Sequence, residues 1–134
     1  MKMSDYLLDV NVIVAHAMTD HVHHRLVFDW LHKNARNGAS YYVCPIIELG
    51  LVRNAMRIGG LSIGEAQQLL ENETVNLALQ KIPDSISANQ LPSWVQGYRQ
   101  STDAYLSELA KSHKLTLLTI DKEIPGAQII KNYL

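Results

Sequence analysis

The fold is decided by residues 6–18, which read Tyr-Leu-Leu-Asp-Val-Asn-Val-Ile-Val-Ala-His-Ala-Met. Residues 6–10 form a short apolar run, and residues 12–18 form an apolar, helix-like stretch. This pattern predicts a buried strand that leads directly into a helix. The polar side chains of Asp9 and Asn11 then lie where the strand ends.

The rest of the chain alternates in the same way. Pro45 suits the first turn of a helix, because its missing amide hydrogen would have no partner there. Ser62 and Glu65 form a capping-box signature at the start of another helix. Helices are expected over residues 23–35, 45–58, 62–72 and 104–113. Strands are expected over residues 41–44, 75–82, 115–120 and 128–130. Residues 84–99 are expected to form a loop that can include a helical turn.

This alternation predicts an α/β fold: a three-layer α/β/α sandwich with a mainly parallel central sheet. With 134 residues and neither a repeat nor a linker-like segment in the sequence, we expect a single domain over residues 1–134. Ligands bind beyond the carboxyl ends of the strands in such sheets. Asp9 and Asp121 both follow predicted strands and are expected at that edge.

Composition excludes several classes of protein. The formal net charge of -1 argues against a uniformly basic, DNA-coating protein, so any nucleic-acid contact requires a local patch or a bound cation. The single cysteine, Cys44, cannot form an internal disulfide, which suits a reducing compartment. The apolar run near the start of the sequence is too short to cross a bilayer. We therefore expect a cytoplasmic protein that does not associate with membranes.

Four carboxylates are placed to meet at one edge of the predicted sheet. Asp9 and Asp121 end strands, Glu48 lies one turn into a helix, and Asp103 opens another helix. Carboxylates brought close together repel one another unless a cation neutralises them. Mg²⁺ and Mn²⁺ prefer oxygen ligands and are held by a few carboxylates together with water and substrate phosphates. Such a metal activates water and stabilises charge on a phosphodiester.

Each acid also has a purely structural interpretation, as a helix cap, a dipole-complementing residue, a turn residue or a solvated side chain. Their joint placement favours the metal centre. Asn11 is expected to support the site by hydrogen bonding, and Thr119 is expected to orient Asp121 through its hydroxyl. Thr119 is equally compatible with a role as a simple strand former.

Four segments of the sequence resemble motifs of the PIN-domain VapC toxins, in the order in which that family carries them. They are Leu7-Leu8-Asp9-Val10-Asn11-Val12, Pro45-Ile46-Ile47-Glu48-Leu49-Gly50-Leu51-Val52-Arg53, Thr102-Asp103-Ala104-Tyr105-Leu106 and Leu117-Leu118-Thr119-Ile120-Asp121. The resemblance covers nearly the whole chain. One departure is Val10, where these toxins often carry threonine.

The resemblance implies a PIN-like fold and an endoribonuclease with Mg²⁺ or Mn²⁺ as its cofactor. It implies that Asp9, Glu48, Asp103 and Asp121 form the acidic cluster that holds the metal and carries the catalysis. It also implies RNA as the substrate, a VapB-type antitoxin as the partner and a homodimer as the assembly.

Several residues are candidates for contact with RNA. Arg53 and Arg57 share one face of a predicted helix, so they can place positive charge near a phosphate backbone. Arg99 lies beside Trp94 and Tyr98 in the predicted loop, where aromatic and guanidinium groups can stack on unpaired bases. A solvated helix face and aromatic packing under a loop are the simpler alternatives. The histidines of residues 20–24 are expected to be exposed polar groups rather than a transition-metal site.

Two other functions remain open from the sequence. In a strand-exit aspartate phosphotransferase, Asp9 would be a covalent nucleophile, although the second aspartate expected at position 11 is an asparagine. In a non-catalytic binding module of similar fold, the acids would only cap helices. A metal-dependent nuclease is distinguished from both by RNA cleavage that requires the metal.

Overall fold

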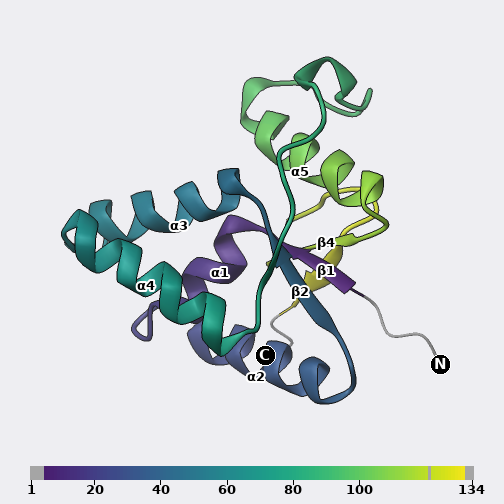
Figure 1. Cartoon of the computed structure of the whole chain (residues 1–134). Helices are drawn as coiled ribbons and strands as arrows, with labels where there is room; N and C mark the ends of the chain where they lie inside the picture. The colour runs from purple at the N-terminus through teal and green to yellow at the C-terminus, as the bar shows by residue number, and fades with distance from the viewer. Residues whose placement is uncertain (1–4, 121, 132–134) are drawn as a thin grey trace.

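The computed structural model describes residues 5–120 and 122–131, and its centre is a five-stranded parallel sheet (Figure 1). The strands lie in the order β3-β2-β1-β4-β5. Leu7 of the central strand pairs with Tyr42 on one side and Leu117 on the other. The strands are β1 (Asp5–Leu8), β2 (Ser40–Val43), β3 (Gln80–Lys81), β4 (Thr116–Ile120) and β5 (Gln128–Ile130).

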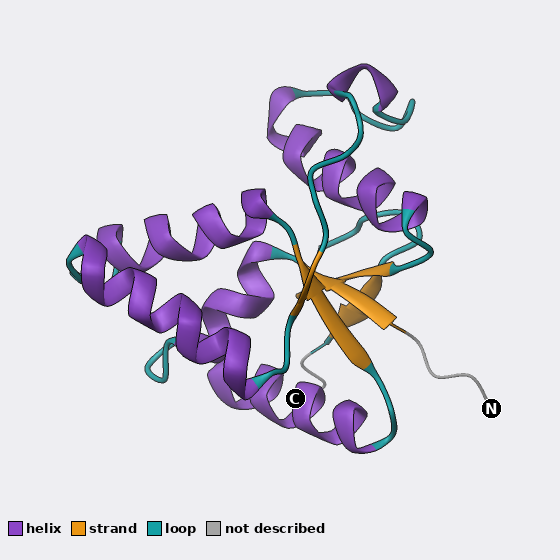
Figure 2. Cartoon of the chain, viewed as in Figure 1, coloured by secondary structure: helices purple, strands orange, loops and turns teal. Residues whose placement is uncertain are grey.

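Helices cover both faces of this sheet (Figure 2). α5 (Ser101–Ser112) packs against β1 and β4 on one face, whereas α1 (Val10–Ala17) and α2 (His24–Arg36) lie on the other. α3 (Pro45–Arg57) and α4 (Ile63–Asn76) form an antiparallel hairpin that extends away from the sheet (Figure 1). The three-layer α/β/α architecture expected from the sequence is confirmed.

The connection from β1 to α1 follows the predicted pattern, with a boundary two residues earlier than expected. β1 ends at Leu8 and Asp9 caps α1, accepting a hydrogen bond from the Val10 amide at 2.7 Å. Residues 12–15 of α1 are all buried, as the unbroken apolar run requires. Burial of that helix fixes the position of Asp9 at the carboxyl edge of the sheet.

The strand expected over residues 75–82 is wrong. α4 continues to Asn76, four residues beyond its expected end, and only Gln80 and Lys81 pair with β2. The fourth turn of α4 is held by the buried Glu73, which contacts His16 of α1. Ala78 then adopts φ of 50°, a left-handed conformation that ends the helix. The two 3₁₀ turns, Ala88–Gln90 and Tyr98–Gln100, lie in the segment expected to be mostly loop.

A buried polar pair joins α1 to α4. His16 Nδ1 lies 2.5 Å from Glu73 Oε1, and both side chains are about 5% exposed. His16 Nε2 lies 3.0 Å from His32 Nε2 of α2, and the His16 ring stacks on Phe28. Both nitrogens of His16 therefore have partners, as a buried imidazole requires.

In the part of the chain that the structure describes, no helix combines the length and the apolar character that crossing a bilayer demands.

Gly50 sets the approach of α3 to α1. A Cβ atom added at Gly50 would lie 2.6 Å from Val10 Cγ2 and 2.8 Å from Val10 Cγ1. Because β-branched side chains are stiff at χ1, Val10 cannot turn aside freely. The two helices therefore require glycine at this crossing.

We expect Gly50→Ala to lower the free energy of unfolding by about 1–3 kcal/mol, because overpacking a tight contact forces neighbouring groups to shift. Chemical denaturation monitored by circular dichroism measures this change. Gly64→Ala is the matched control, since Gly64 lies in α4 with open space around its would-be Cβ. Alanine there should leave stability unchanged or raise it by up to about 1 kcal/mol. Equal effects of the two substitutions would contradict the close-approach argument.

We expect His16→Ala to lower the free energy of unfolding by about 3–5 kcal/mol, because Glu73 would lose the partner of a buried pair. His23→Ala is the control, because the His23 side chain does not hydrogen-bond to the helix that it precedes. Its effect should stay within about 0.5 kcal/mol. A loss for His16→Ala no larger than that of the control would show that the buried pair contributes nothing.

Candidate active site

Asp9 is the best-anchored carboxylate at the carboxyl edge of the sheet. Its side chain is nearly inaccessible, with the residue 2% exposed. Oδ1 accepts a hydrogen bond from the Val10 amide, and Oδ2 accepts one from the Thr119 hydroxyl at 2.8 Å. β1 and β4 are neighbours in the sheet, so the end of β4 brings Thr119 beside Asp9. These two bonds fix the orientation of the carboxylate.

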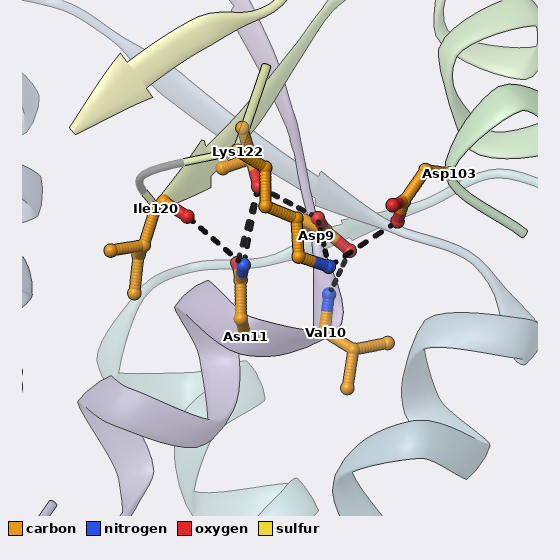
Figure 3. Close-up of polar contacts among 7 residues, drawn as sticks. Asp9, Val10, Asn11, Asp103, Ile120 and Lys122 are labelled. Carbon is orange, nitrogen blue, oxygen red and sulfur yellow. Dashed lines mark hydrogen bonds and ion pairs between the residues drawn. The ribbon is translucent and has the colours of Figure 1, made fainter. Parts of the chain in front are cut away.

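Asn11 and Thr119, the two predicted supporting residues, meet at this site. Asn11 Nδ2 lies 3.2 Å from Thr119 Oγ1 and 3.5 Å from the Ile120 carbonyl oxygen (Figure 3). The sequence predicts that the Thr119 hydroxyl orients Asp121, whereas in the structure this hydroxyl donates to Asp9. Asp121 itself lies outside the described residues. Asn11 thus supports Asp9 through Thr119 rather than by direct contact.

Lys122 joins Asp9 to Asp103. Its ammonium lies 3.7 Å from Asp9 Oδ2 and 3.4 Å from Asp103 Oδ1 (Figure 3). Asp103 lies in the first turn of α5, and its side chain points toward the Lys122 ammonium (Figure 3). Burial and the nearby negative charge of Asp9 raise the pKa of the Asp103 carboxyl, and Lys122 opposes that shift. The two carboxylates therefore share one cation.

Glu48 has a different partner. It lies in the first turn of α3, and its Oε2 is 2.9 Å from the ammonium of Lys81 on β3. Over residues 5–120 and 122–131, no three His, Cys, Asp or Glu side chains come close enough to hold one metal ion. The structure thus brings Asp9 and Asp103 together across Lys122, while Glu48 is paired with Lys81.

A cavity of about 400 Å³ opens beside Val10 and Lys122, two residues that contact the Asp9 carboxylate. Lys122 and Asn11 form part of its wall, and apolar side chains of α1 and the end of α3, among them Val10 and Ile58, form another part. Ile58 is 65% exposed, although it is a large apolar side chain. The cavity therefore offers both polar and apolar groups beside the lysine that pairs with Asp9 and Asp103.

The arginines predicted to contact RNA lie on the surface. Arg53 and Arg57 are exposed on α3, and Arg57 Nη2 is 3.3 Å from Oδ1 of Asn54, another residue of the cavity wall. Arg99 is exposed, and its guanidinium lies 5.6 Å from the centre of the Tyr98 ring. Among the three predicted arginines, Arg57 is therefore the one that hydrogen-bonds to a residue of the cavity wall.

Cys44 is a buried thiol. It is 1% exposed at the start of α3, and burial together with a hydrogen bond to Asp84 raises the pKa of its thiol to about 12. Reactive cysteines need an accessible thiolate. Burial and the raised pKa of its thiol therefore argue against Cys44 as a reactive cysteine.

Two lysines of the site are not predicted from the sequence. Lys81 and Lys122 each pair with a predicted acidic residue. Lys122 follows directly after the last of the four resembling motifs, and this position is the one signal in the sequence that could have drawn attention to it.

The PIN domain family matches residues 6–128 of the chain. This chain belongs to the PIN-domain family. Within the family it is similar to two VapC proteins of Mycobacterium tuberculosis. Ribonuclease VapC29 is 36% identical over 116 residues, covering 86% of this chain and 84% of the relative. Ribonuclease VapC38 is 34% identical over 121 residues, with the same coverage. The VapC-type resemblance drawn from the four motifs is confirmed.

A solved structure supports the PIN fold. The crystal structure of VapBC2 from Rickettsia felis bound to a DNA fragment from their promoter matches with a TM-score of 0.67 and 16% identity. The match covers 95% of this chain and 98% of that one. At this identity the match shows a shared fold.

We expect Thr119→Val to lower the free energy of unfolding by about 1–3 kcal/mol, because Asp9 would lose a hydrogen bond while it remains buried. Thr119→Ser retains the hydroxyl and should preserve most of the stability. Urea denaturation of the two variants measures the difference. A valine variant as stable as the serine variant would contradict this role of the hydroxyl.

Proposed function

We propose that this PIN domain is a metal-dependent endoribonuclease and the toxin of a toxin–antitoxin pair. One observation carries the proposal: two carboxylates at the carboxyl edge of the sheet, Asp9 and Asp103, flank a single cation, the ammonium of Lys122. The similarity to VapC proteins named ribonucleases supports the same function.

The residues at this edge fit a hard divalent metal. Their donor atoms are carboxylate oxygens, and Mg²⁺ is typically held by one or two carboxylates together with water and substrate phosphates. The position of the Lys122 ammonium indicates that the pair attracts positive charge. Asp9 and Asp103 would hold Mg²⁺ or Mn²⁺, with Glu48 and Asp121 as the further acids of the proposed catalytic cluster. When bound, the metal supplies an activated water and stabilises negative charge on the phosphodiester.

The protein groups around this pair have separate roles in the proposed reaction. Thr119 and the Val10 amide hold the Asp9 carboxylate in one orientation, and Asn11 holds Thr119. Oriented ligands reduce the reorganisation needed when charge develops. Arg53, Arg57 and Arg99 would contact the phosphate backbone of the RNA, since exposed arginines bind phosphates through paired N–H groups.

The alternative in which Asp9 is a phosphoryl acceptor is disfavoured by its contacts. Both carboxylate oxygens accept hydrogen bonds, and the residue is nearly inaccessible. A covalent nucleophile requires an oxygen that can reach the phosphorus atom. A cation does reach this carboxylate, since the Lys122 ammonium lies 3.7 Å from Oδ2, so Asp9 is better suited to hold a cation than to attack a substrate.

The proposed partner is a VapB-type antitoxin, and the proposed assembly is a homodimer. The Rickettsia felis structure of similar fold is a VapBC complex, which supports an antitoxin partner. An antitoxin of this kind would keep the ribonuclease inactive until it is released.

We expect Asp9→Asn to reduce RNA cleavage by about 100-fold or more, because loss of several kcal/mol of charge stabilisation corresponds to at least that factor. Asparagine is also a good N-cap, so α1 should remain folded. The measurement is incubation of antitoxin-free protein with total RNA, with and without Mn²⁺, followed by mapping of new RNA ends.

Asp29→Asn is the matched control, because the Asp29 side chain is 63% exposed on α2 and pairs with Arg25. It should cleave RNA like the unmodified protein. Metal-dependent cleavage that survives Asp9→Asn would overturn the proposed function. Loss of cleavage accompanied by loss of the circular dichroism spectrum would instead show a folding defect, and Asp103→Asn then provides the second test.

A further inference from the structure

Lys122 pairs with the two carboxylates to which the proposed function assigns a metal ion. Its ammonium is within 4 Å of both Asp9 Oδ2 and Asp103 Oδ1 (Figure 3). Among the residues that the structure describes, Lys122 is the one cationic side chain that forms an ion pair with Asp9 or with Asp103, and it pairs with both. A divalent ion held by the same two oxygens would meet the ammonium at close range, and like charges at that distance repel.

We propose that Lys122 is a built-in competitor of the divalent metal, which holds Asp9 and Asp103 together before the metal binds and is displaced when it does. This inference rests on the proposed function, because it assumes that both carboxylates are metal ligands. Lys122 is a positioning residue in this scheme, acting on the two acids rather than on the substrate bond.

The displaced ammonium can move into the cavity that Lys122 lines. The Lys122 side chain is 43% exposed and forms part of the wall of the 400 Å³ cavity. A lysine stem has four flexible carbons, so the ammonium can leave the pair while the backbone stays in place. In the cavity wall the ammonium becomes available to a phosphate of bound RNA. Lys122 would thus oppose metal binding and favour RNA binding.

The pairing of Lys122 differs from an ordinary surface ion pair. Lys111 pairs with Glu108 one turn away on the same exposed helix face, and such pairs contribute little. Lys122 instead bridges carboxylates from two separate elements, the end of β1 and the start of α5, and one of them is buried. Removing its charge therefore leaves two acids without their shared cation.

Mn²⁺ titration without RNA, measured by calorimetry, tests the competition. We expect Lys122→Met to lower the dissociation constant for Mn²⁺ by about three- to tenfold, the range that corresponds to loss of one partly buried charge interaction. Lys122→Arg, which keeps the charge, should bind Mn²⁺ like the unmodified protein. Lys111→Met is the matched control and should also leave the affinity unchanged. Equal or weaker Mn²⁺ binding by Lys122→Met would overturn the inference.

Displacement of the ammonium has a direct readout. In a titration with diamagnetic Mg²⁺, the side-chain ¹⁵N resonance of Lys122 should shift as the metal binds, while that of Lys111 stays in place. Metal binding with an unmoved Lys122 resonance would refute displacement. At saturating Mn²⁺, Lys122→Met should raise KM for a single-stranded RNA several-fold with little change in kcat.

These results separate the inference from the proposed function. If the unmodified protein and Lys122→Met bind Mn²⁺ equally and Asp9→Asn abolishes cleavage, the nuclease function stands and the competition is wrong. If neither protein binds Mn²⁺, both proposals fall.

Discussion

The hydrogen bond from the Thr119 hydroxyl to Asp9 is the contact on which the site depends. It joins the ends of two adjacent strands, and the second oxygen of the same carboxylate caps α1. One buried side chain therefore fixes a strand, a helix and a neighbouring strand at the same point. Since a buried carboxylate without partners is costly, the local fold and the orientation of Asp9 are determined together.

Two lysines neutralise the three described acids at this edge. Lys122 bridges Asp9 and Asp103, and Lys81 pairs with Glu48. The chain thus supplies ammonium groups to acids that would otherwise repel one another. The chain can therefore gather carboxylates at one edge while its formal net charge stays at -1, because lysines at the same edge offset them.

The sequence predicted the layers of the fold and the strand-exit position of Asp9, because apolar periodicity reports directly on burial. It failed over residues 75–82, where the contact between Glu73 and His16 keeps the chain helical and apolar periodicity gives no sign of such a contact. The supporting role of Thr119 was anticipated, but its partner was not, since the pairing of β1 with β4 decides which carboxylate it reaches. Lys122 is not part of any apolar periodic pattern, so its two ion pairs could be recognised only in the structure.

The imidazole–carboxylate contact between α1 and α4 also limits how the helical hairpin can sit. Apolar surfaces tolerate a helix that slides or rotates by a few residues, because one methyl group can replace another. A hydrogen-bonded pair in the buried interior forms at only one relative position of the two helices. Any shift of one helix along the other would leave both buried groups without partners. The long arm formed by α3 and α4 is therefore held at one angular setting relative to the helix that carries the site.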